Sequence, residues 1–326
     1  TKRTRTISDN AQWFEDNSPV DSRFRKPVVK GVTANVICAA MLGGDEYPST
    51  AIGINLPNAD WIRAQHGSKS VTIGNLTDAY NKAAKGNGFL EEFAIDQDTV
   101  DMIRKYGDIC DDLHTDLHEC LGHGSGQLLP GVNPDALKAY GNTIEEARAD
   151  LFGLYYIADR KLVELKLTPD ENAYKSQYYS YIMNGLLSQL VRITPGNKIE
   201  EAHMRNRALI AHWCLENGNA IALEKRNGKT YVRINDYEAL RQQFATLLAE
   251  VQRIKSEGDY EAGRKLVETY AVNIDSDIHN EVLQRYKRLN IAPYKGFLNP
   301  RMLPVFNAKG EVIDITLDYS EGYAEQ

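Results

Sequence analysis

The chain has 326 residues, of which 42% are apolar and 25% charged, as in an ordinary globular protein with one large domain or two smaller ones. Thirty-eight Lys and Arg residues against forty-five Asp and Glu give a net charge of −7, which argues against nucleic acid or an anionic membrane as a partner, because phosphate binding needs a positive surface. No apolar stretch approaches the roughly 18 residues of a membrane helix.

The cysteines are widely spaced, at Cys38, Cys110, Cys120 and Cys214, without a C-x-x-C pair. They therefore predict neither a disulfide framework nor a structural zinc knot, and they favour a reducing compartment, so we predict a cytoplasmic protein. The sequence begins at Thr1 without an initiator Met or a signal-like apolar core, and we expect further residues upstream.

The first half of the chain predicts few long elements. We expect an N-terminal helix with Ser8 as its N-cap, and then an apolar run over 32–42. Residues 47–58 are predicted to be extended, and Pro and Asn mark the end of the segment. From about Asp98 onward the signals are mainly helical.

The second half predicts helices interrupted by hairpins. A helix is expected from the Thr168 cap to about Ile193, and a second one from about Lys198 to Glu216. Asn227-Gly228 predicts a tight hairpin. Further helices are expected at about 236–256, 259–271 and 276–289, with another hairpin near Lys309-Gly310. The predicted fold class is mostly α, with small β-hairpin elements.

A His-Glu pair, His118 and Glu119, is followed closely by a second histidine, His123. The pattern resembles the H-E-x-x-H arrangement in which two imidazoles bind zinc and Glu acts as a base. Here the spacing is H-E-x-x-G-H, one residue longer. In a regular helix, positions five apart point about 140° from each other, against about 40° for positions four apart. Both imidazoles therefore reach one metal only if the helix is bulged, which Gly122 is well placed to permit.

A third ligand is available about twenty residues downstream, in the helical segment that contains Glu145, Glu146 and Asp150. Glu146 and Asp150 are four residues apart and share one helix face. A carboxylate that completes a two-histidine site, with another acid one turn later to hold an imidazole N–H, is typical of zinc peptidases built on two helices.

Other interpretations of these residues stay open at this point. His118 and His123 can be helix histidines without a metal, and His114 with His118 is a rival pair at regular helical spacing. Glu146 can instead close a capping box with Thr143 and only satisfy a backbone donor.

The two motifs together, H-E-C-L-G-H and E-E-A-R-A-D, resemble the H-E-x-x-G-H and E-E-C-R-x-[DE] pair of the dipeptidyl peptidase III family of zinc exopeptidases. Two further segments resemble that family: G-I-N-L-P-N at 53–58, and A-H-M-R-N-R at 202–207. These blocks lie between residues 53 and 207, and the metal motifs are the most specific of them.

The resemblance implies a role for each matching residue. His118, His123 and Glu146 would ligate one Zn²⁺ per chain, with Glu119 as the general base for the zinc-bound water. Glu145 and Asp150 would accept hydrogen bonds from the two imidazoles. His203 would help stabilise the transition state. The implied substrate-binding residues are Asn55, Asn58, Arg207 and Arg301.

The resemblance also implies what this chain does and what it lacks. The expected function is release of dipeptides from the N-terminus of short peptides. Residues 1–326 would form a single zinc-bearing upper lobe, with a substrate-binding extended segment at about 47–60. The family's lower lobe is built largely from upstream sequence, so we expect that lobe of the full-length protein as a partner. Two alternatives remain: a zinc- and peptide-binding fragment with little turnover, and an aminopeptidase of another zinc clan.

Overall fold

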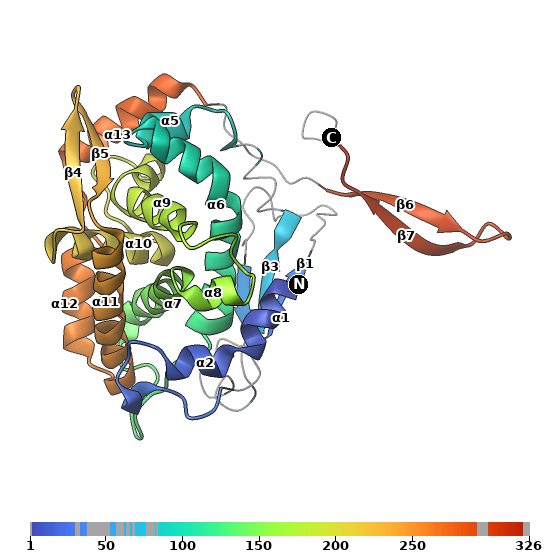
Figure 1. The fold of residues 1–326 in the computed structure, drawn as a ribbon, viewed down its shortest axis with the longest axis horizontal. Coiled ribbons are helices and arrows are strands. Elements are labelled where there is room, and N and C mark those ends of the chain that lie inside the picture. Colours follow the sequence, from blue (N-terminus) through green and yellow to red (C-terminus); the bar gives the residue numbers. More distant parts are fainter. Residues whose placement is uncertain are drawn as a thin grey trace.

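The computed structural model describes residues 2–29, 33–37, 53–56, 62, 66, 69–75, 82, 84–291 and 299–321. These residues are mostly helical, which confirms the predicted fold class (Figure 1). None of the helices in the described ranges is long and apolar enough to cross a membrane. Cys110, Cys120 and Cys214 are buried and form no disulfide, whereas Cys38 lies outside the described residues.

Helix α7 (Gly141–Ile157) is the centre of the helical body. It packs against α6 (Gln97–Leu117), α10 (Ala202–Glu216) and α11 (Tyr237–Glu257), and α6 and α10 also pack against α9 (Tyr174–Leu186). Most of the 17 residues of α7 are buried, on every side of the helix, as its apolar sequence predicts. Acidic side chains on this helix are therefore held inside the protein.

Aspartate side chains set the start of the last three helices. Asp236 accepts a hydrogen bond from the Ala239 N–H at the start of α11. Asp259 does the same for α12 (Tyr260–Tyr270), and Asp275 for α13 (Ser276–Leu289). Each cap satisfies backbone donors that have no partner within the helix. All three helices lie where the sequence predicts them.

Other helical segments in the described ranges are short, among them α1 (Lys2–Asp9), α2 (Ala11–Asp16), α5 (Phe89–Phe93), α8 (Arg160–Glu164), and the 3-10 turns Ser22–Phe24, Lys138–Tyr140 and Ser188–Arg192. Helices α1 and α2 pack against each other, and α1 also contacts α6; their side chains Ile7 and Phe14 are completely buried in the main core.

Both predicted hairpins are present. Strands β4 (Ile221–Arg226) and β5 (Lys229–Ile234) are joined by Asn227 and Gly228, with φ values of 50° and 75°, as a tight mirror-image turn requires. Strands β6 (Arg301–Phe306) and β7 (Val312–Asp318) form a second hairpin that projects from the helical body (Figure 1).

A small three-stranded sheet has the order β1-β3-β2. Strand β1 (Thr33–Ile37) is parallel to β3 (Lys69–Ile73), and β2 (Gly53–Leu56) is antiparallel to β3, with Asn55 opposite Ser70. The extended conformation predicted for 47–58 is confirmed for residues 53–56. The rest of that segment, Asn58 included, lies outside the described residues.

Three predicted helix starts are wrong. Ser8 lies near the end of α1 instead of capping a helix, because the residues before it already form the turn that buries Ile7. The helix expected from Thr168 begins at Tyr174, since the Asp170 carboxylate accepts a hydrogen bond from the Asn172 N–H and holds a local turn. Helix α10 begins four residues later than predicted, where the Glu201 side chain caps it; the prediction placed the start at Lys198.

Candidate metal centre

Helix α6 does not stop at Leu117 but continues into one π-helical turn, His118–Gly122. The turn is closed by a hydrogen bond from the His123 N–H to the His118 carbonyl oxygen, at 3.0 Å. Because this bond joins residues five apart, it brings His118 and His123 to the same side of the helix. The bulge that the extra residue requires is therefore present.

Gly122 makes a second contribution, which the sequence did not predict. A Cβ atom at this position would lie 2.6 Å from the Cα and 2.8 Å from the Cβ of Ala149 on α7. The absence of a side chain thus lets the π-helical turn pack directly against the backbone of the helix that carries the acidic residues.

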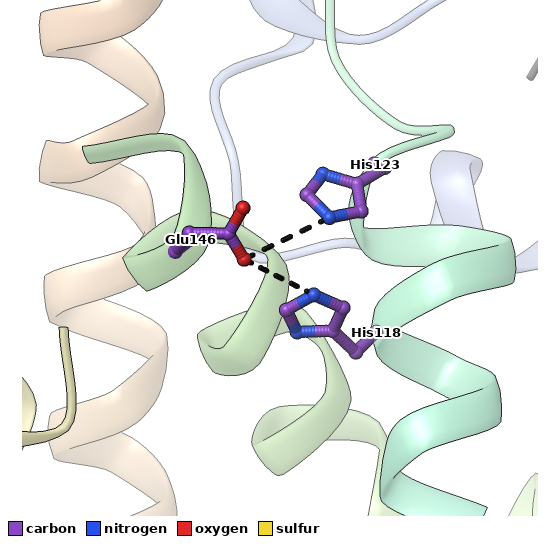
Figure 2. A group of neighbouring side chains, drawn as sticks. All are labelled: His118, His123 and Glu146. Atoms are coloured by element: carbon purple, nitrogen blue, oxygen red, sulfur yellow. Dashed lines mark ion pairs between the residues drawn. The ribbon is translucent and has the colours of Figure 1, made fainter. Parts of the chain in front are cut away.

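Three side chains converge between the π-helical turn and α7 (Figure 2). The Glu146 Oε2 atom lies 3.3 Å from His118 Nε2 and 3.8 Å from His123 Nε2. All three ligand atoms lie within 4.8 Å of one another. In a tetrahedral zinc site with bonds of 2.0–2.1 Å, neighbouring ligand atoms are about 3.3 Å apart. The cluster is therefore close to the dimensions of a metal site.

Glu146 Oε2 is buried and makes no hydrogen bond of good geometry, although imidazole nitrogens of His118, His203 and His123 lie 3.3, 3.4 and 3.8 Å from it. A buried carboxylate oxygen without such a bond is costly, and the two imidazole nitrogens in front of it are the atoms that a cation would share with it. The three residues thus fit a divalent metal ion, and two nitrogens with one oxygen form a donor set that suits zinc.

Asp150 fixes the orientation of His118. Its Oδ1 lies 2.6 Å from His118 Nδ1, and its Oδ2 accepts hydrogen bonds from Tyr181 (2.7 Å) and Asn206 (2.8 Å). Burial alone would raise the pKa of Asp150, but the neighbouring His118 imidazole outweighs it and lowers the pKa far below its usual range. Since a carboxylate only accepts, Nδ1 carries a hydrogen, which leaves Nε2 as the ring nitrogen that can bind a metal when the ring is neutral.

Glu145 does the same for His123, with its Oε1 2.8 Å from His123 Nδ1. Arg148 donates to both oxygens of Glu145, at 2.8 and 3.0 Å, and Lys255 pairs with Oε2. Burial opposes ionisation of Glu145, yet Arg148 and Lys255 hold its pKa well below the usual range. Both imidazoles are therefore locked with Nε2 toward Glu146.

His203 and Arg207 lie on α10, beside this cluster. His203 Nδ1 is 3.4 Å from Glu146 Oε2, and its side chain is 53% exposed. Arg207, one turn later, is half-buried. Burial opposes ionisation of Asp150, but the imidazoles of His118 and His114 and, to a smaller extent, Arg207 lower its pKa. Glu119 is half-buried on the π-helical turn, directly after His118.

The rival arrangements are not formed. Gln177 donates to Nδ1 of His114 at 3.0 Å, and His114 Nε2 donates to the backbone oxygen of Asp150 at 3.3 Å, so neither ring nitrogen is left for a metal. Thr143 lies inside α7, whose N-cap residue is Tyr140, so Thr143 and Glu146 form no capping box.

Of the other predicted substrate residues, only Arg301 has a side chain within the described part of the structure. Asn55 is on β2, and Asn58 is outside the described residues. Arg301 is on the projecting hairpin, where its side chain is 60% exposed and pairs with Glu321 at 3.0 Å. Their roles in substrate binding stay predictions.

The chain matches the model of peptidase family M49 over residues 46–138 and 130–288, which is most of its length. It belongs to family M49. Among its relatives are dipeptidyl peptidase 3 of Mus musculus and of Homo sapiens, each 27% identical over 267 residues, which are 69% of this chain but 36% of either relative. The chain thus spans about a third of the length of these curated relatives.

Solved structures support the fold of this M49 chain. It is similar to DPP III from Caldithrix abyssi, with a TM-score of 0.69, 22% identity, and coverage of 89% of this chain and 53% of that one. DPP III from Corallococcus sp. strain EGB gives a TM-score of 0.70 at 22% identity, with 89% and 51% covered.

Sequence reasoning missed the side chains that hold the two acids of the M49 motif: Tyr181, Asn206, Arg148 and Lys255. One of them had a local signal, because Arg148 lies three residues after Glu145 on the same helix and can pair with it. The others come from α9, α10 and α11, and no pattern within α7 indicates them.

We predict that Asp150→Asn weakens metal binding about 10- to 100-fold, the usual effect of losing the hydrogen-bond acceptor of a ligand histidine. The amide removes the negative charge at His118 and sets an N–H group against the donors Tyr181 or Asn206. Competition with a chelating dye measures the dissociation constant. Asp159→Asn is the matched control, since Asp159 pairs with Arg241 beyond the end of α7. Equal affinities in parent and Asp150→Asn would contradict the prediction.

Proposed function

We propose that this chain is the zinc-bearing part of a metallo-exopeptidase that releases dipeptides from the N-terminus of short peptides. The observation that carries the proposal is the buried Oε2 of Glu146, which makes no hydrogen bond of good geometry and faces Nε2 of His118 and His123. Membership of family M49 and the name of the relatives, dipeptidyl peptidase 3, support the reaction class.

His118, His123 and Glu146 would hold one zinc ion per chain and leave a fourth position open to solvent or substrate. When bound, the ion supplies a Lewis acid that polarises the scissile carbonyl and makes a water molecule more acidic. Glu119, next to His118, would take a proton from the attacking water and deliver it to the leaving amine.

His203 would stabilise the negative charge that develops on the substrate oxygen. Its half-exposed ring, 3.4 Å from Glu146, lies beside the ligands on the solvent side of α10, where a peptide carbonyl can approach. Arg207 is one turn further along the same helix and would meet the peptide beyond the scissile bond.

Substrate selection would depend on β2, which lies at the edge of the three-stranded sheet. An extended peptide can pair with an edge strand, and Asn55 and Asn58 would then hold its free amino end. Capture of the amine at a fixed distance from the metal limits the product to a dipeptide. Arg301 would contact the far end of the peptide.

Residues 1–326 would work as one catalytic lobe in the cytoplasm, with a second lobe as the opposite wall of the peptide cleft. The support for a second lobe is that the curated relatives are much longer than this chain. We therefore expect peptide binding with slow turnover from this chain alone, and faster turnover in the presence of the other lobe.

Metal content per chain tests the proposal. The parent is expected to hold about one zinc, and Glu146→Ala to lose most of it, because removing one of three ligands leaves only two imidazole nitrogens to bind the ion. Elemental analysis after dialysis measures both. Glu164→Ala is the control, since that side chain is 66% exposed on α8. A parent chain that holds no zinc after reloading at neutral pH would overturn the proposal.

A further inference from the structure

The loop Gly124–Gly126 directly follows the second histidine of the cluster, His123. It is outside the helices, and Gly126 has a φ of 66°, in the left-handed region. Glycines at both ends give the loop much conformational freedom, and the hydrogen bond from the Ser125 N–H to the Gly122 oxygen leaves the Gly124 carbonyl and the Gly126 N–H in need of other partners. Something else must hold the loop if His123 is to keep a fixed position.

The N-terminal segment provides part of that support. Lys26 Nζ donates a hydrogen bond to the Gly124 carbonyl oxygen at 2.5 Å, and Glu15 Oε1 accepts one from the Gly126 N–H at 2.9 Å. Glu15 also accepts from the Lys26 N–H at 2.5 Å, so the two side chains are joined to each other. They bind the loop at its first and last residues.

Helix α7 holds the opposite side of the loop. Arg148 donates to the Ser125 carbonyl oxygen at 3.1 Å and to its hydroxyl at 2.8 Å, while that hydroxyl donates to the Gly122 oxygen. The same guanidinium binds Glu145, which orients the His123 ring. The backbone next to His123 is thus held from two sides, once by α7 and once by residues about a hundred positions upstream.

The N-terminal support is built into the core. Glu15 is only 2% exposed, and the neighbouring Phe14 and Phe24 are among the largest fully buried side chains. Burial, with a smaller contribution from Arg148, lowers the pKa of Lys26 to about 8, so the ammonium still predominates at neutral pH. Buried charges satisfied by short hydrogen bonds resist displacement, because an unpaired charge would be left behind. These residues precede the segment that matches the M49 model.

We propose that Glu15 and Lys26 are positioning residues for His123, which clamp the Gly124–Gly126 loop and thereby slow the release of the metal. This inference rests on the proposed zinc site. The N-terminal segment would then help to retain the metal, although neither residue touches the three ligands.

The test is the rate at which zinc-loaded protein releases its metal to a chelating dye in excess. Lys26→Met keeps the length of the side chain and removes the donor to Gly124, and Glu15→Met leaves the Gly126 N–H without an acceptor. Each variant is expected to release zinc about tenfold faster than the parent, at the low end of the effect of outer-shell partners. Glu15→Gln keeps an Oε1 acceptor and is expected to stay closer to the parent rate.

A cobalt-loaded sample gives a second measurement that a purely structural role would not change. The visible absorption bands of cobalt report the ligand geometry, and they are expected to shift in Lys26→Met. Arg241→Met is the matched control, because this cation is 19% exposed and binds Asp159 and the Tyr155 oxygen, at the opposite end of α7 from Glu145. The control is expected to lower the melting temperature without changing the release rate or the cobalt spectrum.

The outcomes separate this inference from the proposed function. Zinc release at the parent rate from Lys26→Met, with an unchanged cobalt spectrum, would overturn the role of the N-terminal residues and leave the zinc site intact. A parent chain that takes up no metal would overturn both. If Glu15→Met does not fold, the Lys26→Met variant alone tests the inference, since Lys26 is only half-buried and its replacement disturbs the core less.

Discussion

Glu119→Gln is expected to lower the rate of dipeptide release at least about a hundredfold while zinc stays bound, because general base catalysis is commonly worth 10²–10⁴ in rate. The amide has nearly the same shape as the carboxylate but cannot take a proton from water. Glu119 lies next to His118 and is not among the three side chains of the cluster, so the ligand set is unchanged. The rate of dipeptide release by Glu119→Gln is compared with that of the parent chain under the same conditions.

The assay uses one short peptide in two forms, with a free and with a blocked amino end. The parent is expected to release a dipeptide only from the free form, because the amine would be held at a fixed distance from the metal. Single amino acids as the product would favour an aminopeptidase of another zinc clan. Peptide binding without any product would favour a zinc- and peptide-binding fragment. Full activity in Glu119→Gln would show that another group is the base.

Gly122→Ala is expected to destabilise the protein by about 1–3 kcal/mol, the usual cost of forcing extra volume into a packed interior, and to weaken metal binding with it. The added Cβ would lie 2.6–2.8 Å from backbone and side-chain atoms of Ala149. Helix α7 cannot retreat from this contact without moving Glu146 and Asp150, which lie on either side of Ala149 in the sequence. Gly122→Ala should therefore lower both the free energy of unfolding and the affinity for the metal.

Thermal unfolding of the metal-free protein and zinc titration measure the two effects separately. Gly141→Ala is the control on the partner helix, because its nearest neighbour, the Leu137 Cβ, would be 3.8 Å away. That change is expected to be neutral, or to stabilise α7 by up to about 1 kcal/mol through helix propensity. A Gly122→Ala protein as stable as the parent would mean that the two elements do not need their close contact.

The parts of the fold that depend on nearby residues could be predicted from the sequence. The Asn227-Gly228 turn fixes its hairpin because both residues adopt positive φ at low cost. The last three helices begin at aspartates whose side chains reach backbone donors two or three residues away. By contrast, Thr168 and Ser8 have the residue types of a helix cap but do not act as caps, since such residues also satisfy local turns or lie inside helices.

For the site, the sequence by itself determined the identity of the metal-binding candidates and the need for a bulge, because helical geometry makes the H-E-x-x-G-H spacing incompatible with a regular helix. Only the tertiary structure decided how those side chains are held. Arg148 and Lys255 keep Glu145 ionised, and Glu15 and Lys26 form hydrogen bonds to the loop after His123. The physical reason is that burial makes an unpaired charge or backbone group costly, so each needs a partner, and that partner comes from whichever element packs there, however distant in the sequence.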